Sequence, residues 1–138
     1  MQLILSSYLA GLVWFVHVVH YPLFDGVGED HFHSYHQRHV RDTGFVVAIP
    51  MLLELALAIT AVIVQSRTPK WCSISGAVLV VIVWISTFGL QVPEHNRLSN
   101  GFDDNSYRRL VSTNVVRTIA WSCRVVLTAF VVYTIANK

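Results

Sequence analysis

Four long apolar segments, separated by three more polar links, organise the chain. They are Leu3–Val19, Gly44–Val64, Ile74–Val92 and Thr118–Ala136, each 17 to 21 residues long. A helix needs about 20 apolar residues to cross a bilayer, within a range of roughly 17–25. Val, Ile and Leu form continuous blocks, whereas the strands of a membrane barrel alternate polar and apolar positions. The pattern predicts an all-α, integral membrane four-helix bundle that fills residues 1–138 as a single four-span domain.

The composition favours a membrane protein over a soluble one. Of the 138 residues, 54% are hydrophobic and 13% charged, whereas an ordinary soluble domain has about 25% charged residues. The net charge of +2 is too small to indicate a polyanion partner. We therefore expect the lipid bilayer and a lipophilic small molecule as partners, and no nucleic acid. Self-association into a homo-oligomer stays open.

The polar residues gather on one side of the predicted bundle. We call the side that holds both termini side A and the opposite side B. All seven histidines fall on side B, at the end of the first span and in the links His20–Thr43 and Pro93–Arg117. Counting Lys and Arg makes side B cytoplasmic. If several side-B arginines serve a site, side A is cytoplasmic, since it carries Arg67, Lys70 and Lys138 without an acid. We favour this second orientation, in a bacterial inner membrane.

The histidine spacing predicts a metal site on side B. The pattern His-x-x-His occurs at the end of the first span and again within Glu29–Asp42, which we expect to form an amphipathic helix between the first two spans. Residues i and i+3 share one face of a helix, so each pair can point two imidazoles at one place. With one histidine from the third link, the candidate ligands are His17, His20, His36, His39 and His95.

Imidazole nitrogens suit Fe, Cu or Zn. We expect Fe or Cu, with Zn, a dinuclear centre and haem as alternatives. The competing interpretation is that the histidines bind nothing and are polar-tipped side chains at the membrane interface. We expect this of His31 and His33, which lie in the link.

Two ionisable residues lie deep in the predicted spans. Glu54 is ten residues past the start of its span and Arg124 seven residues past Arg117, which is about 15 Å and about 10 Å along a helix. Isolated charges are costly there, so we expect the two to pair, or Glu54 to be protonated. A helix unbroken from His39 would place Glu54 about 22 Å away, too far to ligate the same metal. Glu54 is then either a proton carrier or half of a structural pair.

The fourth span carries a polar stripe. Asn114, Arg117, Trp121 and Arg124 follow i, i+3, i+7, i+10 spacing, which is one helix face. Hydrogen-bond donors, positive charge and an aromatic ring suit a carbonyl, quinone or carboxylate on an apolar ligand. The alternative is that Trp121 packs and Arg117 extends to the interface.

The third link adds further candidates on side B. Asn96 and Arg97 follow the histidine of this link and join the expected substrate-binding residues. Asp103 or Asp104 is placed to cap a short helix that ends at Leu110. We expect that short helix to lie over side B as a lid.

The last third of the chain resembles small four-span bacterial membrane proteins distantly similar to the anthrone-oxygenase-like family. The resemblance rests on PEHNRL at 93–98, NVVRT at 114–118 and WSCR at 121–124. It implies a four-helix membrane bundle that oxidises a polyaromatic or quinone-like molecule. It carries over four residues: Asn96, Leu98, Trp121 and Arg124. The histidine-rich first link is not part of that family's pattern.

A weaker resemblance is to the HemJ-type protoporphyrinogen oxidases. It rests on the aromatic first span, where Trp14-Phe15-Val16-His17 is the matching stretch. This resemblance implies haem as the cofactor.

These observations predict a membrane oxidoreductase or oxygenase. A histidine-ligated metal or haem on side B acts on a lipophilic, quinone-like or aromatic substrate that lies against Trp121. Arg117 and Arg124 hold the substrate's oxygen and Glu54 moves a proton. The alternatives are a protein that binds or transports a metal or haem without catalysis, and a non-catalytic subunit.

Overall fold

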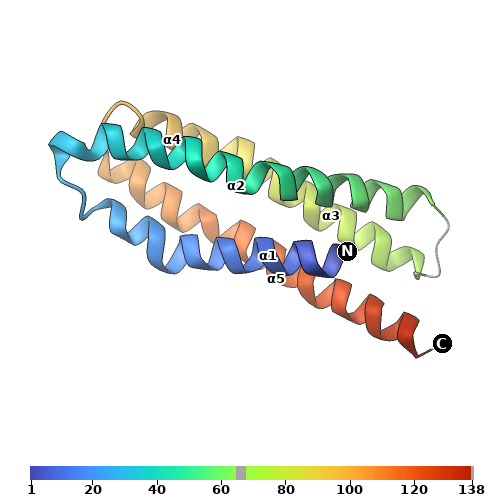
Figure 1. Cartoon of the computed structure of the whole chain (residues 1–138). Helices are drawn as coiled ribbons and strands as arrows, with labels where there is room; N and C mark the ends of the chain where they lie inside the picture. Colours follow the sequence, from blue (N-terminus) through green and yellow to red (C-terminus); the bar gives the residue numbers. More distant parts are fainter. Residues whose placement is uncertain (65–67, 138) are drawn as a thin grey trace.

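The chain forms an antiparallel bundle of four long helical arms (Figure 1). The computed structural model describes residues 1–64 and 68–137, and these residues contain no strand. Four helical stretches are long and apolar enough to cross a membrane: Gln2–Phe24, Glu29–Ile63, Lys70–Leu98 and Asp104–Ala136. The predicted all-α, four-span bundle is therefore confirmed. Arg67 and Lys138, which entered the orientation argument, lie outside the described residues.

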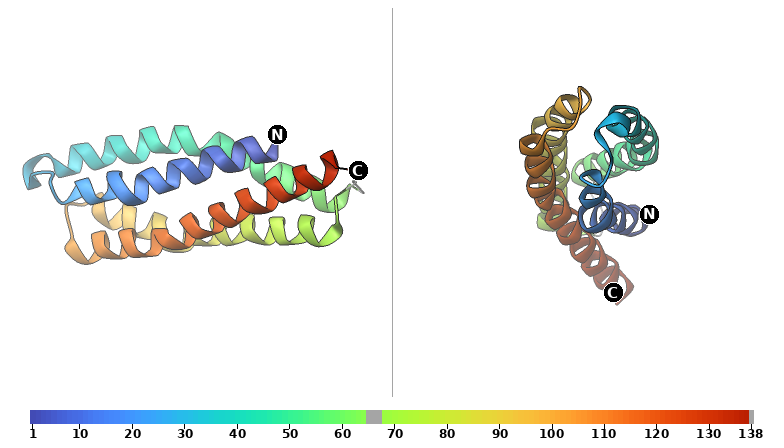
Figure 2. Two further views of the ribbon diagram at one scale, coloured as in Figure 1. Left: turned by 90° about the horizontal axis from the view of Figure 1, so that it is seen from below. Right: turned by 90° about the vertical axis from the view of Figure 1, so that its left-hand side faces the viewer.

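The arms contain eight helical elements. In chain order they are α1 (Gln2–Phe15), η1 (Val16–His20), η2 (Tyr21–Phe24), α2 (Glu29–Ile63), α3 (Lys70–Ser86), η3 (Thr87–Gln91), α4 (Val92–Leu98) and α5 (Asp104–Ala136). The segments η1 and η3 are π-helical and η2 is a 3₁₀ turn. The start of α1 and the end of α5 lie toward the end of the bundle where α2 ends and α3 begins, which is side A (Figures 1 and 2).

Two helices are longer than the sequence predicted. The amphipathic segment Glu29–Asp42 and the second span form one helix, α2. Residues 29–43 contain neither Gly nor Pro, so no residue there would end the helix. The expected lid helix is the first part of α5 and not a separate element. Asp103 caps α5, and its carboxylate accepts a hydrogen bond of 2.7 Å from the backbone N–H of Ser106. This hydrogen bond holds the pKa of Asp103 below its ordinary value.

The interior has two apolar clusters and the outer surface is apolar as well. One cluster lies at mid-bundle: Leu9, Ala10, Val13, Met51, Val83, Ala120 and Trp121. The other lies near side B: Val16, Tyr21, Phe24, Phe32, Leu98 and Leu110. Large apolar side chains such as Phe45 and Val126 are at least 70% exposed, which suits contact with lipid. Cys72 and Cys123 are both free.

Candidate histidine centre and cavity

Four of the five candidate histidines converge at the side-B end. His20 comes from η1, His36 and His39 from α2, and His95 from α4. Nε2 of His20 lies 2.7 Å from Nδ1 of His39, and Nε2 of His36 lies 3.1 Å from Nδ1 of His95. The two pairs are adjacent, since the ring centroids of His39 and His95 are 5.3 Å apart. The structure therefore brings these four imidazoles together from three segments of the chain.

The remaining ring nitrogens of His36 and His95 lie against hydroxyl groups. Nδ1 of His36 lies 3.3 Å from the Oγ of Ser99, whose hydroxyl donates to the backbone carbonyl of His95 at 2.9 Å. A serine hydroxyl has one proton, so Ser99 accepts from His36, and the neutral ring presents an unprotonated Nε2 to His95. On the other side, Nε2 of His95 lies 3.1 Å from the hydroxyl of Tyr21.

Aromatic rings enclose the cluster. Phe24 and Phe32 are fully buried. The ring of Phe32 stacks on His36 with centroids 5.6 Å apart, and that of Phe24 meets His39 edge-on at 5.0 Å. These rings fix the imidazole orientations and keep bulk water away from His36.

His17 lies apart from the cluster, although the sequence predicted that it would join His20. Its ring contacts Trp14 with centroids 6.5 Å apart. Its Nδ1 is buried without a hydrogen-bond partner among the described residues. His17 and His20 both lie in the π-helical η1, where i→i+5 bonding puts more residues in each turn. Residues three apart therefore no longer share a face. His31 and His33 are exposed, as predicted.

A cavity of about 120 Å³ lies inside the bundle next to the histidines. Tyr21, His39, His95 and Arg117 line its side-B end, and most of the remaining wall is apolar. The apolar part of the wall consists of Leu9, Leu12, Val13, Val16, Val40, Val47, Met51, Val83 and Trp121, and Thr43 and Thr87 add hydroxyl groups. Trp121, His39 and His95, three of the predicted site residues, thus border one cavity.

Arg117 brings a positive charge to this cavity. Its guanidinium donates from Nε and Nη2 to the Oδ1 of Asn114, at 3.0 and 2.6 Å, and from Nη2 to the hydroxyl of Tyr21 at 3.4 Å. These partners are neutral, and none of the ion pairs among the described residues includes Arg117. Asn114, fully buried, positions the guanidinium and does not line the cavity.

Glu54 and Arg124 form an ion pair outside this cavity. The Nη2 of Arg124 donates to the Oε2 of Glu54 at 3.1 Å, as the sequence predicted. Met51 and Trp121, one turn nearer side B on α2 and α5, line the cavity, whereas Glu54 and Arg124 do not. Arg124 therefore does not contact the space in which a substrate of this cavity would lie, contrary to the expectation from the sequence.

Asn96 and Arg97 point away from the histidines and are exposed. Arg97 donates to the Oε1 of Glu94 at 2.8 Å. The predicted role of these two residues in substrate binding has no support from their placement. Because α4 is a regular helix, bringing His95 into the cluster turns the next two residues outward.

Tyr21 is the residue that sequence reasoning missed. It sits between His95 and Arg117 and lines the cavity. The one available signal was its position directly after His20, at the mouth of the first span. The sequence analysis did not predict the π-helical segments η1 and η3. These segments also border the cavity, through Val16 and Thr87.

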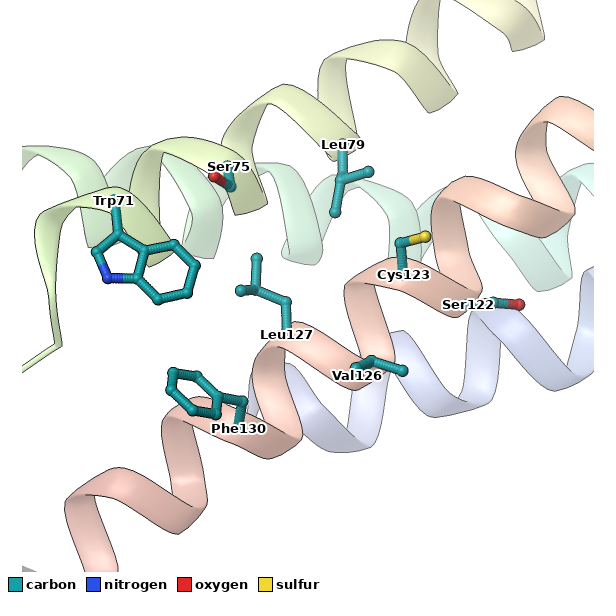
Figure 3. A pocket seen from close by; sticks show the side chains of 8 residues that line it. All are labelled: Trp71, Ser75, Leu79, Ser122, Cys123, Val126, Leu127 and Phe130. Atoms are coloured by element: carbon teal, nitrogen blue, oxygen red, sulfur yellow. The ribbon is translucent and has the colours of Figure 1, made fainter.

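A second hollow lies on the lipid-facing side of α3 and α5 (Figure 3). It is a nearly wholly apolar groove of about 540 Å³. Its walls are Trp71, Ser75, Leu79, Ser122, Cys123, Val126, Leu127 and Phe130. None of the candidate site residues borders it, so it takes no part in the histidine centre.

Among the described residues, no group of three or more His, Cys, Asp and Glu side chains is arranged to hold a metal ion. The histidine contacts are pairwise. No family model, curated protein or solved structure matches the chain.

Proposed function

We propose that the protein is a membrane oxidoreductase whose side-B histidines hold a transition metal beside a cavity for a lipophilic aromatic molecule. One observation carries the proposal. Four imidazoles from three segments meet in two nitrogen–nitrogen contacts of 2.7 and 3.1 Å, and two of them, His39 and His95, line a mostly apolar cavity.

The pair formed by His36 and His95 has the features of metal ligands. Metal–nitrogen bonds to imidazole are about 2.0–2.1 Å long, so two nitrogens 3.1 Å apart can bind one ion between them. Ligating histidines usually have their other nitrogen held by a hydrogen bond. Ser99 and Tyr21 supply such partners here.

The second pair, His20 and His39, supplies the further ligands. The described residues are not arranged to hold one ion among all four imidazoles, so we propose that each pair would hold its own ion. Fe or Cu suits imidazole nitrogen and supplies one-electron chemistry, whereas Zn is redox-inactive. We propose Fe or Cu over haem because a porphyrin far exceeds the cavity of about 120 Å³ that His39 and His95 line, and the larger hollow of about 560 Å³ at His20 and His39 is open to the surface.

The proposed reaction oxidises a hydroquinone-type molecule in the cavity. Conversion of a hydroquinone to a quinone releases two electrons and two protons. Dioxygen that takes up the two electrons and the two protons becomes hydrogen peroxide. The metal supplies the electron-transfer chemistry. Arg117 would stabilise negative charge on the substrate's oxygen, the hydroxyl of Tyr21 would hydrogen-bond to that oxygen, and both protons end on the dioxygen that is reduced. Glu54 and Arg124 act as a structural pair in this scheme.

We propose a bacterial inner membrane as the location, with side A in the cytoplasm. Arg117 is held by Asn114 at the wall of the cavity, so its charge would serve the proposed site and not the topology.

Metal analysis tests the proposal. The full chain is purified in mild detergent without a histidine tag, and its metal content and absorption spectrum are measured. We expect Fe or Cu at one or two ions per chain, and at least a fivefold loss in His36→Ala and His95→Ala. His33→Ala, an exposed histidine on the same helix as His36, is the matched control and keeps its metal. Equal metal content in all variants, or none in the wild type, would overturn the proposal.

Catalysis and transport are separated by a second measurement. An oxidoreductase turns over a hydroquinone in detergent solution, with oxygen uptake at one dioxygen per quinone formed. Metal flux into sealed vesicles without such turnover would favour the binding or transport alternative.

A further inference from the structure

We infer that the cavity binds a single aromatic ring that carries one oxygen, of the phenol or phenolate class, with the oxygen at the Tyr21–Arg117 end. This inference goes beyond the proposed function, because a ring with one oxygen is a ligand of the cavity and is not the two-oxygen hydroquinone of the proposed reaction. It depends on the shape and charge of the cavity and not on the presence of a metal.

The volume of the cavity limits the ligand to one ring. An apolar cavity of about 150 Å³ in another protein accommodates benzene, and this cavity measures about 120 Å³. The polyaromatic substrate implied by the family resemblance does not fit. A one-ring molecule does fit after small side-chain movements, for which the flexible thioether of Met51 is suited.

The polarity of the wall orients the ligand. Trp121 and Met51 line the cavity at mid-bundle, whereas Tyr21, His95 and Arg117 line it at side B. A ring with one oxygen matches this division, because its apolar edge faces the apolar wall and its oxygen reaches the hydrogen-bond donors. A ring without oxygen would leave the polar end unmatched.

The charge of Arg117 selects an oxygen with anionic character. The guanidinium is partly buried and contacts only neutral groups among the partners described above. A partly buried charge is stabilised by an opposite charge, and a phenolate supplies one without adding volume. The hydroxyl of Tyr21, 3.4 Å from Nη2, marks where an oxygen atom meets this guanidinium.

Fluorine NMR tests the inference on the metal-free protein in detergent. The probes are 4-fluorophenol and fluorobenzene, which differ by the oxygen, and 6-fluoro-2-naphthol, which has a second ring. We expect a bound signal from 4-fluorophenol, at least tenfold weaker binding of fluorobenzene, and no site-specific signal from the naphthol. Equal binding of all three probes would show partition into detergent only and would overturn the inference.

Two variants on α2 separate the cavity from the protein surface. Val47→Phe fills the cavity, because Val47 lines it. Ile49→Phe adds the same ring at a site 65% exposed to lipid. We expect Val47→Phe to abolish the bound signal and Ile49→Phe to keep it. A signal that survives in both variants would contradict the assignment to this cavity.

Arg117→Gln tests the charge preference. We expect the variant to bind 4-fluorophenol at least tenfold more weakly and fluorobenzene less than twofold more weakly. An equal loss of affinity for both probes would contradict the role of charge. Protein that binds 4-fluorophenol but purifies without metal would refute the proposed oxidoreductase alone. Protein that holds metal but fails to bind the phenol would refute this inference alone.

Discussion

Glu54 on α2 and Arg124 on α5 form an ion pair of 3.1 Å in which both side chains are almost completely buried. The pair lies one helical turn from Met51 and Trp121, on the side-A side of the cavity. Buried charges are costly without a partner. The pair therefore joins α2 to α5 one turn away from side chains that line the cavity.

Glu54→Leu should destabilise the bundle by about 3–5 kcal/mol, because it leaves the Arg124 charge buried and unpaired. The double variant Glu54→Leu/Arg124→Met should recover most of this loss, since apolar side chains of similar volume replace the pair. The free energy of unfolding, measured by denaturant titration in mixed micelles, checks both values. If the double variant is as unstable as the single one, the loss of stability in Glu54→Leu does not come from the unpaired charge of Arg124.

Gly76 on α3 leaves room for Arg124. A Cβ added at Gly76 would overlap Nη1 of Arg124, so Gly76→Ala should cost about 1–3 kcal/mol through overpacking. Gly11→Ala, in α1 with open space around the added carbon, is the control and should stabilise by about 0.5–1 kcal/mol because alanine favours a helix. The unfolding titration measures both changes. In the Glu54→Leu/Arg124→Met background Gly76→Ala should lose its cost, and an unchanged cost would locate the collision elsewhere.

The cap of α5 should give the protein a pH dependence at acid pH. Hydrogen bonding lowers the pKa of Asp103, so its stabilising contribution is complete above the unfolded-state pKa of about 3.9. The contribution disappears as the pH falls through the lower folded-state value. Asp103→Ser keeps a capping oxygen without a titrating carboxylate.

Melting temperatures of the two proteins between pH 6 and pH 2.5 check this prediction. Their difference should be constant above pH 5 and should move in favour of Asp103→Ser at lower pH. A constant difference in melting temperature over the whole range would mean that protonation of Asp103 does not change the stability of the protein.

The sequence predicted the fold because apolar length is a direct requirement of the bilayer. It predicted the Glu54–Arg124 pair because two deep charges without partners would be costly. It failed for His17, whose position depends on the π-helical η1, and for Asn96 and Arg97, which face outward once His95 faces inward. It also missed Tyr21, because the contacts of Tyr21 with His95 and Arg117 join residues 74 and 96 positions apart.

Tyr21→Phe tests the link between the histidines and Arg117. The variant keeps the ring but removes the oxygen that lies 3.1 Å from His95 and 3.4 Å from Arg117. Leaving a buried polar atom unpaired costs about 1–3 kcal/mol, so we expect a loss of that size in the free energy of unfolding. Tyr133→Phe is the matched control, because Tyr133 is 68% exposed, and it should change stability by less than about 0.5 kcal/mol. The Nε2 resonance of His95 in ¹⁵N NMR should shift in Tyr21→Phe and stay unchanged in Tyr133→Phe. An unshifted resonance in Tyr21→Phe would show that the phenol does not hold the imidazole of His95, and Tyr21 would then not link the histidines to Arg117.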